Sequence, residues 1–236
     1  MGRAVRERLE AIHRGMRLTA CVDPSGGADM YGALDEYEGA ADVILDFSHH
    51  TCTESLLEYA TARHLPCVIA TTGQSEAERG MIVSASSQIP IFMSANMSLG
   101  IAILARFARM ATSLLPGAEV EIVEVHHDRK ADAPSGTAIL LADAAAESLP
   151  DSEPVYCRRG NKKRDRREIG IHSLRLGGVV GEHRVIIASG DEIISLSHTA
   201  VSRALYADGA LTAAEFIVGK PAGIYDMNDI AGGISK

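Results

Sequence analysis

Short apolar runs alternate with helix-like segments through residues 1–97, and this alternation restricts the possible folds more than any other feature of the chain. The expected strands are residues 18–22, 43–47, 67–70 and 89–93. Helices are expected over residues 2–14, 51–63 and 76–86, with a weaker one around 31–37. Strands that are apolar throughout are typical of a sheet buried on both faces. Residues 1–97 are therefore predicted to form four strand–helix units around a parallel sheet.

The pattern changes at residue 98. A long helix is expected over 99–115, then a strand over 120–125 that runs into His126 and His127, and a helix over 138–146. Further strands are expected at 154–157, 169–176, 179–188 and 192–198, separated by glycine-containing turns. A last helix, 203–218, is followed by Gly219 and Pro221. This half is predicted to be an α+β domain, 98–203, with a mixed or antiparallel sheet and helices on one face; residues 204–236 are expected to pack back on the first domain.

Composition excludes several classes of protein. With 46% hydrophobic and 23% charged residues the chain is ordinary for a soluble globular protein, and it has no apolar run near the ~20 residues of a membrane helix. A net charge of −8 argues against a nucleic-acid-binding protein. The four cysteines, at positions 21, 52, 67 and 157, have no CxxC spacing and are expected to be reduced core residues. The chain is expected in the cytoplasm.

The first domain is predicted to be Rossmann-like and to bind a dinucleotide at the carboxyl ends of its strands. The residues at those ends are Asp23, 47–48, 70–73 and 94–96. Asp23 has the position of an acid that binds an adenosine ribose, although an acid before Pro-Ser-Gly-Gly is as often a turn former. A first strand with a GxGxxG loop is missing, since the chain begins Met1-Gly2-Arg3. Either the recorded start is an internal methionine, or the protein lacks this element and binds nucleotide poorly.

The segment 121–138, EIVEVHHDRKADAPSGTA, gathers titratable groups between a strand end and a helix start. A histidine can exchange a proton near neutral pH, and Lys130 adds a positive charge. Ser135, Gly136 and Thr137 open a helix, where free backbone amides favour a carboxylate or phosphate. The segment therefore predicts an anion site beside a proton donor. A metal site at His126-His127 is disfavoured, because adjacent strand residues point to opposite faces; two histidines with only structural roles remain the alternative.

This segment resembles the catalytic segment of the 4-hydroxy-tetrahydrodipicolinate reductase family, also called dihydrodipicolinate reductase. The resemblance covers nearly the whole chain, because further segments follow in the family's order: DFSHH, VIATTGQSE, FMSANMSLG, VVGEHRV, HTAVSRALYADGAL and GKPAGIYDMNDI. It implies NAD(P)H-dependent reduction of a cyclic dicarboxylate in lysine and diaminopimelate biosynthesis. It also implies a nucleotide domain, a substrate domain, and a homotetramer that associates through the second sheet.

The resemblance also implies roles for individual residues. His126 is expected to donate or accept the proton, with Lys130 as a proton donor that also contacts the substrate. The substrate carboxylates are expected to bind His127, Ser135, Gly136 and Thr137, with Arg203 helping to enclose the substrate. The nicotinamide side of the cofactor is expected to lie against Ala70, Thr71, Thr72, Ser94, Ala95, Asn96 and Met97. Asp23 is expected to bind the ribose, and Met1 is expected to be the last surviving member of the glycine-loop segment.

Two departures from the family bear on the cofactor. Ala70 stands where the family usually has glycine, and Pro24 stands where some members have an arginine suited to the NADP 2′-phosphate. Because Asp23 would repel that phosphate, NADH is expected over NADPH, although His49 could still contact the phosphate.

Alternative functions remain open at this point. They are another two-domain nicotinamide enzyme, and a truncated homologue that binds substrate or partners without turnover. The basic run 158–167 is expected to be a solvated, mobile loop and not a nucleic-acid site.

Overall fold

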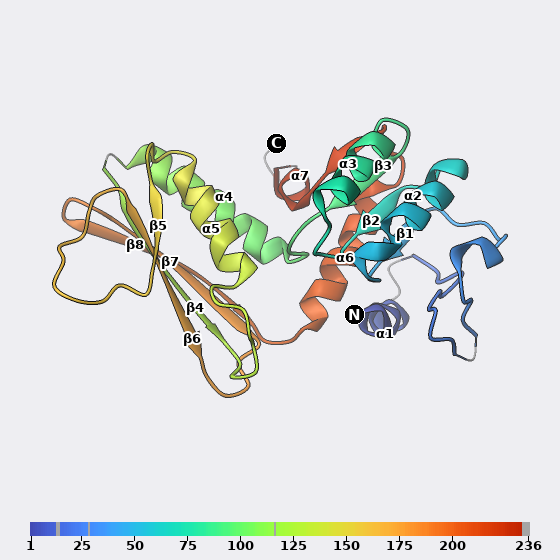
Figure 1. Cartoon of the computed structure of the whole chain (residues 1–236), viewed down its shortest axis with the longest axis horizontal. Coiled ribbons are helices and arrows are strands. Elements are labelled where there is room, and N and C mark those ends of the chain that lie inside the picture. Colours follow the sequence, from blue (N-terminus) through green and yellow to red (C-terminus); the bar gives the residue numbers. More distant parts are fainter. Residues whose placement is uncertain (13–14, 28, 116, 233–236) are drawn as a thin grey trace. The chain divides into compact units, whose positions relative to one another are not determined.

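The computed structural model describes residues 1–12, 15–27, 29–115 and 117–232. It divides into two compact units, one formed by Met1–Met97 with Ala204–Lys236 and the other by Ser98–Arg203 (Figure 1). The final residues 233–236 lie outside the described part, as do residues 13–14 at the end of the first expected helix. Within the described ranges, no helix is long and apolar enough to cross a membrane.

The first unit is built on a parallel four-stranded sheet with the order β1-β2-β3-β9. The strands are β1 (Ile44–Asp46), β2 (Cys67–Ile69), β3 (Pro90–Met93) and β9 (Gly223–Tyr225). The helices are α1 (Gly2–Ile12), α2 (Thr53–Ala62), α3 (Glu76–Ala85), α6 (Ala204–Ile217) and α7 (Met227–Gly232), with short 3-10 turns at Leu34–Glu36 and His50–Cys52. The α/β class predicted from the alternation is confirmed.

Helices cover both faces of this sheet. Cys67, Ile69 and Ile91 pack against α2 and α3 in one buried cluster. Phe92 points to the opposite side, where its ring meets Phe216 of α6 with the centroids 6.2 Å apart. Since successive residues of a strand point to opposite faces, a strand between two layers of helices must be apolar at every position. The run Cys67–Ile69 is accordingly buried throughout.

The expected strand at residues 18–22 does not form. Only an isolated bridge joins Val22 to Tyr31, and Leu18 is exposed. A strand needs a neighbour that takes up its backbone hydrogen bonds, and the described residues hold no strand before this segment that could pair with it. The prediction of four strand–helix units in residues 1–97 was therefore wrong, and the fourth strand of this sheet is instead β9.

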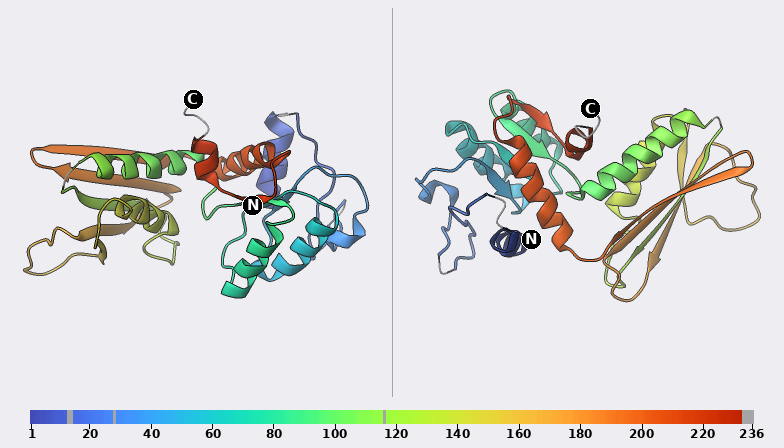
Figure 2. Two further views of the ribbon diagram at one scale, coloured as in Figure 1. Left: turned by 90° about the horizontal axis from the view of Figure 1, so that it is seen from above. Right: turned by 180° about the vertical axis from the view of Figure 1, so that it is seen from behind.

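The second unit is a mixed five-stranded sheet with the order β5-β6-β4-β7-β8. Its strands are β4 (Glu119–His126), β5 (Glu153–Tyr156), β6 (Glu168–Arg175), β7 (Gly181–Ser189) and β8 (Glu192–Ala200). Strands β5, β6 and β4 run parallel, whereas β7 is antiparallel to both β4 and β8. Helices α4 (Leu99–Leu114) and α5 (Gly136–Ala146) lie side by side along one face, as Figures 1 and 2 show. The mixed sheet with helices on one face was predicted correctly.

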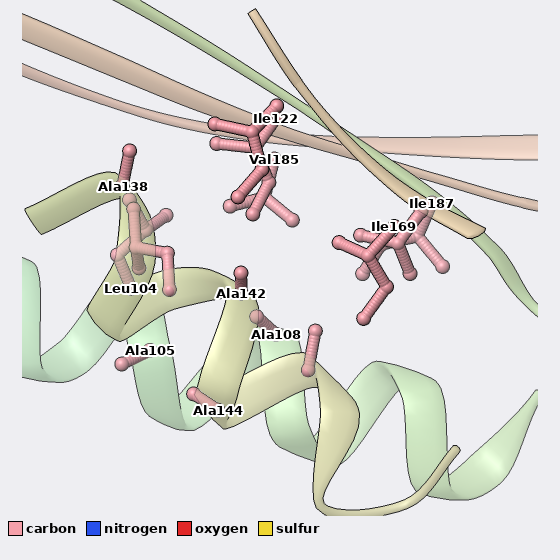
Figure 3. Close-up of a cluster of buried hydrophobic side chains, with 14 of the residues drawn as sticks. Leu104, Ala105, Ala108, Ile122, Ala138, Ala142, Ala144, Ile169, Val185 and Ile187 are labelled. Carbon is pink, nitrogen blue, oxygen red and sulfur yellow. The ribbon is translucent and has the colours of Figure 1, made fainter. Parts of the chain in front are cut away.

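Alternation along β4 creates the core of this unit. Val120 and Ile122 are fully buried, while the strand residues that alternate with them are only half-buried. Figure 3 shows branched strand side chains pointing at alanines of α4 and α5, among them Ala108 and Ala142. Small helix residues allow the helices to approach the sheet closely. This packing fixes the distance between β4 and the two helices, and with it the position of the polar residues at the end of the strand.

Three further expectations need correction. The four cysteines are unpaired as expected, but only Cys67 is buried and Cys157 is exposed. Strand β9 and helix α7 were not predicted. The basic run is not only solvated, because Arg158, Lys162 and Arg164 form ion pairs with carboxylates such as Glu168.

Candidate active site

The end of strand β4 carries the residues that the sequence singled out. Glu124 and His126 are two positions apart, so both point to the helix-covered face, and both are buried. On the neighbouring strands, His183 of β7 lies opposite Glu124 and Arg175 of β6 lies opposite His126. Cross-strand neighbours on one face are within side-chain reach, so the sheet register brings these four groups together.

Glu124 is fully buried, and both of its oxygens accept hydrogen bonds. Arg175 donates from Nη2 to Oε1 at 2.9 Å and from Nη1 to Oε2 at 3.0 Å. The backbone N–H of Ser135 donates to Oε1 at 3.2 Å, and His126 Nδ1 bonds Oε2. Burial alone raises the pKa of Glu124, but hydrogen bonds from Arg175, Ser173 and His126 outweigh it and hold the pKa below its ordinary value. Glu124 is therefore an internal carboxylate anion.

The imidazole of His126 is enclosed on two further sides. The His183 ring meets it edge to face, with centroids 5.1 Å apart and planes at 73°. Gly181 leaves room for it, because a methyl group there would lie 3.1 Å from Nε2. Within the described part of the chain Nε2 makes no hydrogen bond, whereas Nδ1 is held by Glu124. The ring therefore has one occupied nitrogen and one nitrogen free to meet a ligand.

His183 is held neutral in the core. It is 3% exposed, and its Nε2 lies 3.2 Å from Ser135 Oγ. Burial, followed by the neighbouring His126, lowers the pKa of His183 to about 4. At neutral pH this imidazole adds no charge to the site.

The pKa of His183 predicts how stability depends on pH. Its folded pKa of about 4 lies below the ordinary histidine pKa of 6.5, so the unfolded chain binds the proton more tightly and stability falls as pH drops from about 6.5 towards 4. Between pH 7.5 and 5.5 this residue should remove about 1 kcal/mol of unfolding free energy. In urea titrations at the two pH values, we expect the fall in unfolding free energy to be smaller by that amount in His183→Asn than in the wild type. The exposed His64→Asn should keep the wild-type difference; equal losses in all three proteins would contradict the assignment.

The start of α5 forms the second part of the site. Ser135 caps the helix by accepting from the N–H of Ala138 at 3.2 Å, and Gly136 and Thr137 form its first turn. A first turn presents backbone amides and the positive end of the helix dipole, which favour an anion. Lys130 lies in the loop before it and donates to both oxygens of Asp132 at 2.8 Å. That bond lowers the pKa of Asp132.

His127 points away from His126 and meets Arg203. Arg203 Nη2 lies 3.2 Å from His127 Nε2. Because a guanidinium can only donate, Nε2 accepts and His127 is neutral in this pair. Burial, then the charges of Arg129 and Arg203, lower the pKa of His127. The Nδ1 atom is buried without a partner among the described residues.

A cation at the buried cluster is a poor fit. Glu124, His126 and His183 each offer a ligand atom within 4.8 Å of one another. However, Arg175 already donates to both oxygens of Glu124, and a fixed guanidinium repels a metal ion. We therefore interpret the trio as a hydrogen-bonded network.

The residues expected at the cofactor lie in the other unit, mainly at the carboxyl ends of β2 and β3. Ile69 pairs with Met93, so the segments that follow, 70–72 and 94–97, begin side by side. Thr71 Oγ1 is buried and has no hydrogen-bond partner in the described part of the chain. A buried hydroxyl is normally satisfied, so this one is available to a ligand. The residues present therefore fit a nucleotide at this sheet edge.

Two other expected cofactor residues, Asp23 and Met1, lie elsewhere in that unit. Asp23 is not on a sheet strand but in a turn, where its Oδ1 accepts from the Ser25 N–H at 2.9 Å and from the Ser25 hydroxyl at 2.6 Å. These bonds lower the pKa of Asp23. The turn-forming alternative for Asp23 thus describes its local structure. Met1 is exposed at the start of α1, and Met97 is buried against Gly209 of α6.

Sequence reasoning missed Glu124, Arg175, His183 and Gly181 as parts of the site. Glu124 did carry a signal, because a charged residue two positions before His126 on a buried strand must share its face. Arg175 gave none, since a basic residue at a strand end is usually solvated. Its partner lies 51 positions away in the sequence.

The comparisons with known proteins agree across the whole chain. The family model "Dihydrodipicolinate reductase, N-terminus" matches residues 1–97, and "Dihydrodipicolinate reductase, C-terminus" matches residues 100–231. The N-terminal domain of this family binds a nucleotide.

Individual relatives give the same result. The chain is 47% identical over 203 residues to a 4-hydroxy-tetrahydrodipicolinate reductase from Caldanaerobacter subterraneus subsp. tengcongensis, covering 85% of this chain and 81% of the relative. It is 43% identical over 232 residues to an Exiguobacterium enzyme of the same name, covering 98% and 91%. A dipicolinate-bound dihydrodipicolinate reductase from Paenisporosarcina sp. TG-14 has the same fold, with a TM-score of 0.82 at 22% identity over 97% of this chain and 94% of that one. With both family models and relatives of this similarity matched, the chain belongs to the dihydrodipicolinate reductase family.

Proposed function

We propose that this chain reduces 4-hydroxy-tetrahydrodipicolinate to tetrahydrodipicolinate with a nicotinamide cofactor, as a step of lysine and diaminopimelate biosynthesis. Family membership supports the activity. The observation that carries the proposal for this chain is the pairing of a histidine with a free Nε2, His126, with a helix start that can bind an anion.

The residues of the second unit can perform both tasks that the reduction requires of the protein. A nicotinamide cofactor supplies a hydride to a ring carbon when bound. His126 supplies the accompanying proton from Nε2. The amides of Gly136 and Thr137 bind one substrate carboxylate at the start of α5, and Lys130, His127 and Arg203 contact the other. Ser135 contributes as the cap of that helix, because its own N–H is bonded to Glu124. Holding both carboxylates fixes the ring in one orientation.

The cofactor is proposed to bind in the first unit, with NADH preferred over NADPH. Ala70, Thr71 and Thr72, with Ser94, Ala95, Asn96 and Met97, would hold its nicotinamide side, while Asp23 and Met1 would lie on its adenosine side. The hydrogen bonds from Ser25 favour the ionised form of Asp23, and Pro24 offers no positive charge. A dianionic 2′-phosphate would be repelled there.

Steady-state oxidation of NADH and NADPH tests the activity and the preference together. We expect oxidation of NADH only when the enzyme and freshly generated substrate are both present. We also expect kcat/KM for NADH to exceed that for NADPH by roughly tenfold, as one unpaired charge contact would give. An Asp23→Asn variant should bring the kcat/KM values for NADH and NADPH closer together. No substrate-dependent oxidation would contradict the activity, whereas faster turnover with NADPH would contradict only the preference.

We further propose a cytoplasmic homotetramer that associates through the face of the second sheet opposite α4 and α5. Leu174 and Ile193 point to this face by their register, and both are exposed. Apolar side chains on a sheet face without covering helices are typical of a subunit interface.

A further inference from the structure

Proton transfer from Nε2 of His126 leaves a neutral imidazole with its proton on Nδ1, and it requires a fixed ring orientation. Either ring nitrogen can carry the proton of the neutral ring, and the hydrogen bond that one of them makes decides which is left for the substrate. In this site Nδ1 bonds the buried carboxylate of Glu124, and Nε2 makes no hydrogen bond within the described ranges. Nδ1 is therefore occupied by Glu124, and Nε2 is available to the substrate.

We propose that Glu124 and Arg175 are positioning residues for this proton transfer. Glu124 accepts the Nδ1–H of His126, so that Nε2 delivers the proton, and Arg175 locks Glu124 in the orientation that does so. This inference rests on the proposed function, in which His126 is the proton donor. When the Nε2–H bond breaks, the proton forms a bond to the substrate and the imidazolium returns to neutral imidazole. The Nδ1–H bond to Glu124 is kept throughout.

The geometry around Glu124 explains why two residues are needed. A carboxylate held by one hydrogen bond can rotate and take the imidazole with it. Here the Arg175 fork holds both oxygens, at 2.9 and 3.0 Å, and the Ser135 amide adds a third bond at 3.2 Å. Bidentate guanidinium pairs fix orientation as well as supply energy. Arg175 also donates to the carbonyls of Leu174 and Asp132, so it is itself held in place.

The charges around His126 suit an imidazole that becomes positive before each transfer. Glu124 lies on its own strand, Arg175 on β6, His183 on β7, and His127 and Lys130 in the following loop. The Glu124 carboxylate carries the charge opposite to that of an imidazolium and is hydrogen-bonded to Nδ1. His183 has a pKa of about 4 and stays neutral, so it adds no repulsion. The positive charge of Arg175 repels the imidazolium, but this charge is neutralised by the Glu124 carboxylate.

The test is Glu124→Gln, which keeps the shape and removes the charge. We expect kcat to fall roughly 10- to 100-fold with KM within about twofold, because the tautomer is no longer imposed. A residue with only a structural role would lower kcat without changing which nitrogen of the neutral His126 ring carries the proton.

A spectroscopic measurement decides the question without turnover. Imidazole 15N shifts of His126, assigned among the nine histidines by comparison with His126→Gln, should show a protonated Nδ1 in the neutral wild-type ring. Glu124→Gln should show a mixture of tautomers. If reductase activity were absent altogether, the proposed function would fail, but these shifts would still report on Glu124.

A matched control is available on the same strand. Glu121 contacts His172 Nε2 at 2.9 Å and Arg164 Nε at 3.1 Å, so it has the same kinds of partner on the opposite face of the sheet. Glu121→Gln should leave kcat, the pH profile and the His126 shifts unchanged at equal assembly state.

A second variant guards against misfolding. Glu124→Gln leaves the Arg175 charge buried without a partner, which can prevent folding. If circular dichroism shows that it does, Glu124→Gln with Arg175→Gln removes both charges and should show the same fall in kcat and mixed tautomers. A folded variant with wild-type kcat or with a single Nδ1–H tautomer would overturn the inference.

Discussion

Replacing His126 by glutamine should lower kcat by roughly 100- to 10,000-fold while KM stays within about threefold of wild type. Glutamine can fill the space and bond Glu124, but it cannot release a proton from the position of Nε2. In the proposed function the substrate carboxylates are bound elsewhere, at the start of α5 and in the loop before it, so affinity should change little. Initial rates of cofactor oxidation over a range of substrate concentrations measure both parameters.

The control for this substitution is His172→Gln. His172 is also on the second sheet and also bonds a glutamate, Glu121, at 2.9 Å, but on the opposite face. At equal assembly state it should keep wild-type kinetics. Near-normal turnover of His126→Gln would mean that another group supplies the proton.

Replacing Lys130 by alanine should damage both parameters, with kcat lowered roughly 10- to 100-fold and KM raised about tenfold. The ammonium is expected to contact a substrate carboxylate and to favour proton delivery. In the absence of substrate it is bonded to both oxygens of Asp132 at 2.8 Å. Its removal would leave the Asp132 carboxylate unneutralised beside an anionic substrate, so part of the rise in KM should be repulsion.

A double variant separates these effects. Lys130→Ala with Asp132→Asn removes the repelling carboxylate. Its KM should return part of the way to the wild-type value, while its kcat should stay as low as in Lys130→Ala. Lys163→Ala, in the exposed basic run, should leave both parameters unchanged. A wild-type kcat for Lys130→Ala would mean that Lys130 contributes only to substrate binding.

Local pattern was a reliable guide to the second unit. The strand that ends at His126 alternates between buried and half-buried residues along its whole length, which is the pattern of one covered face. The helix start after Pro134 was equally visible, because Ser135 is a preferred cap and does accept the Ala138 amide. Both features depend on neighbours in the sequence, so they could be predicted.

The first unit shows the limit of local pattern. Residues 18–22 have the composition of a buried strand, yet they form only the Val22–Tyr31 bridge. Gly223–Tyr225 is a short segment after a proline, and it becomes the edge strand beside β3. Whether a segment joins a sheet depends on whether a partner strand has a free edge, and composition carries no information about that.

By itself the sequence determined the fold class, the mixed second sheet and the segment that we propose to hold the proton donor and the anion site, because strand period, helix caps and turn residues are properties of neighbouring residues. Only the tertiary structure decided how His126 is held. In the sequence Glu124 is one acid within a strand. In the fold it is a buried anion between His126 and Arg175, because the register of β4 with β6 joins residues 51 positions apart. A buried charge is stable only when paired, and its partner is chosen by packing and not by the neighbouring sequence.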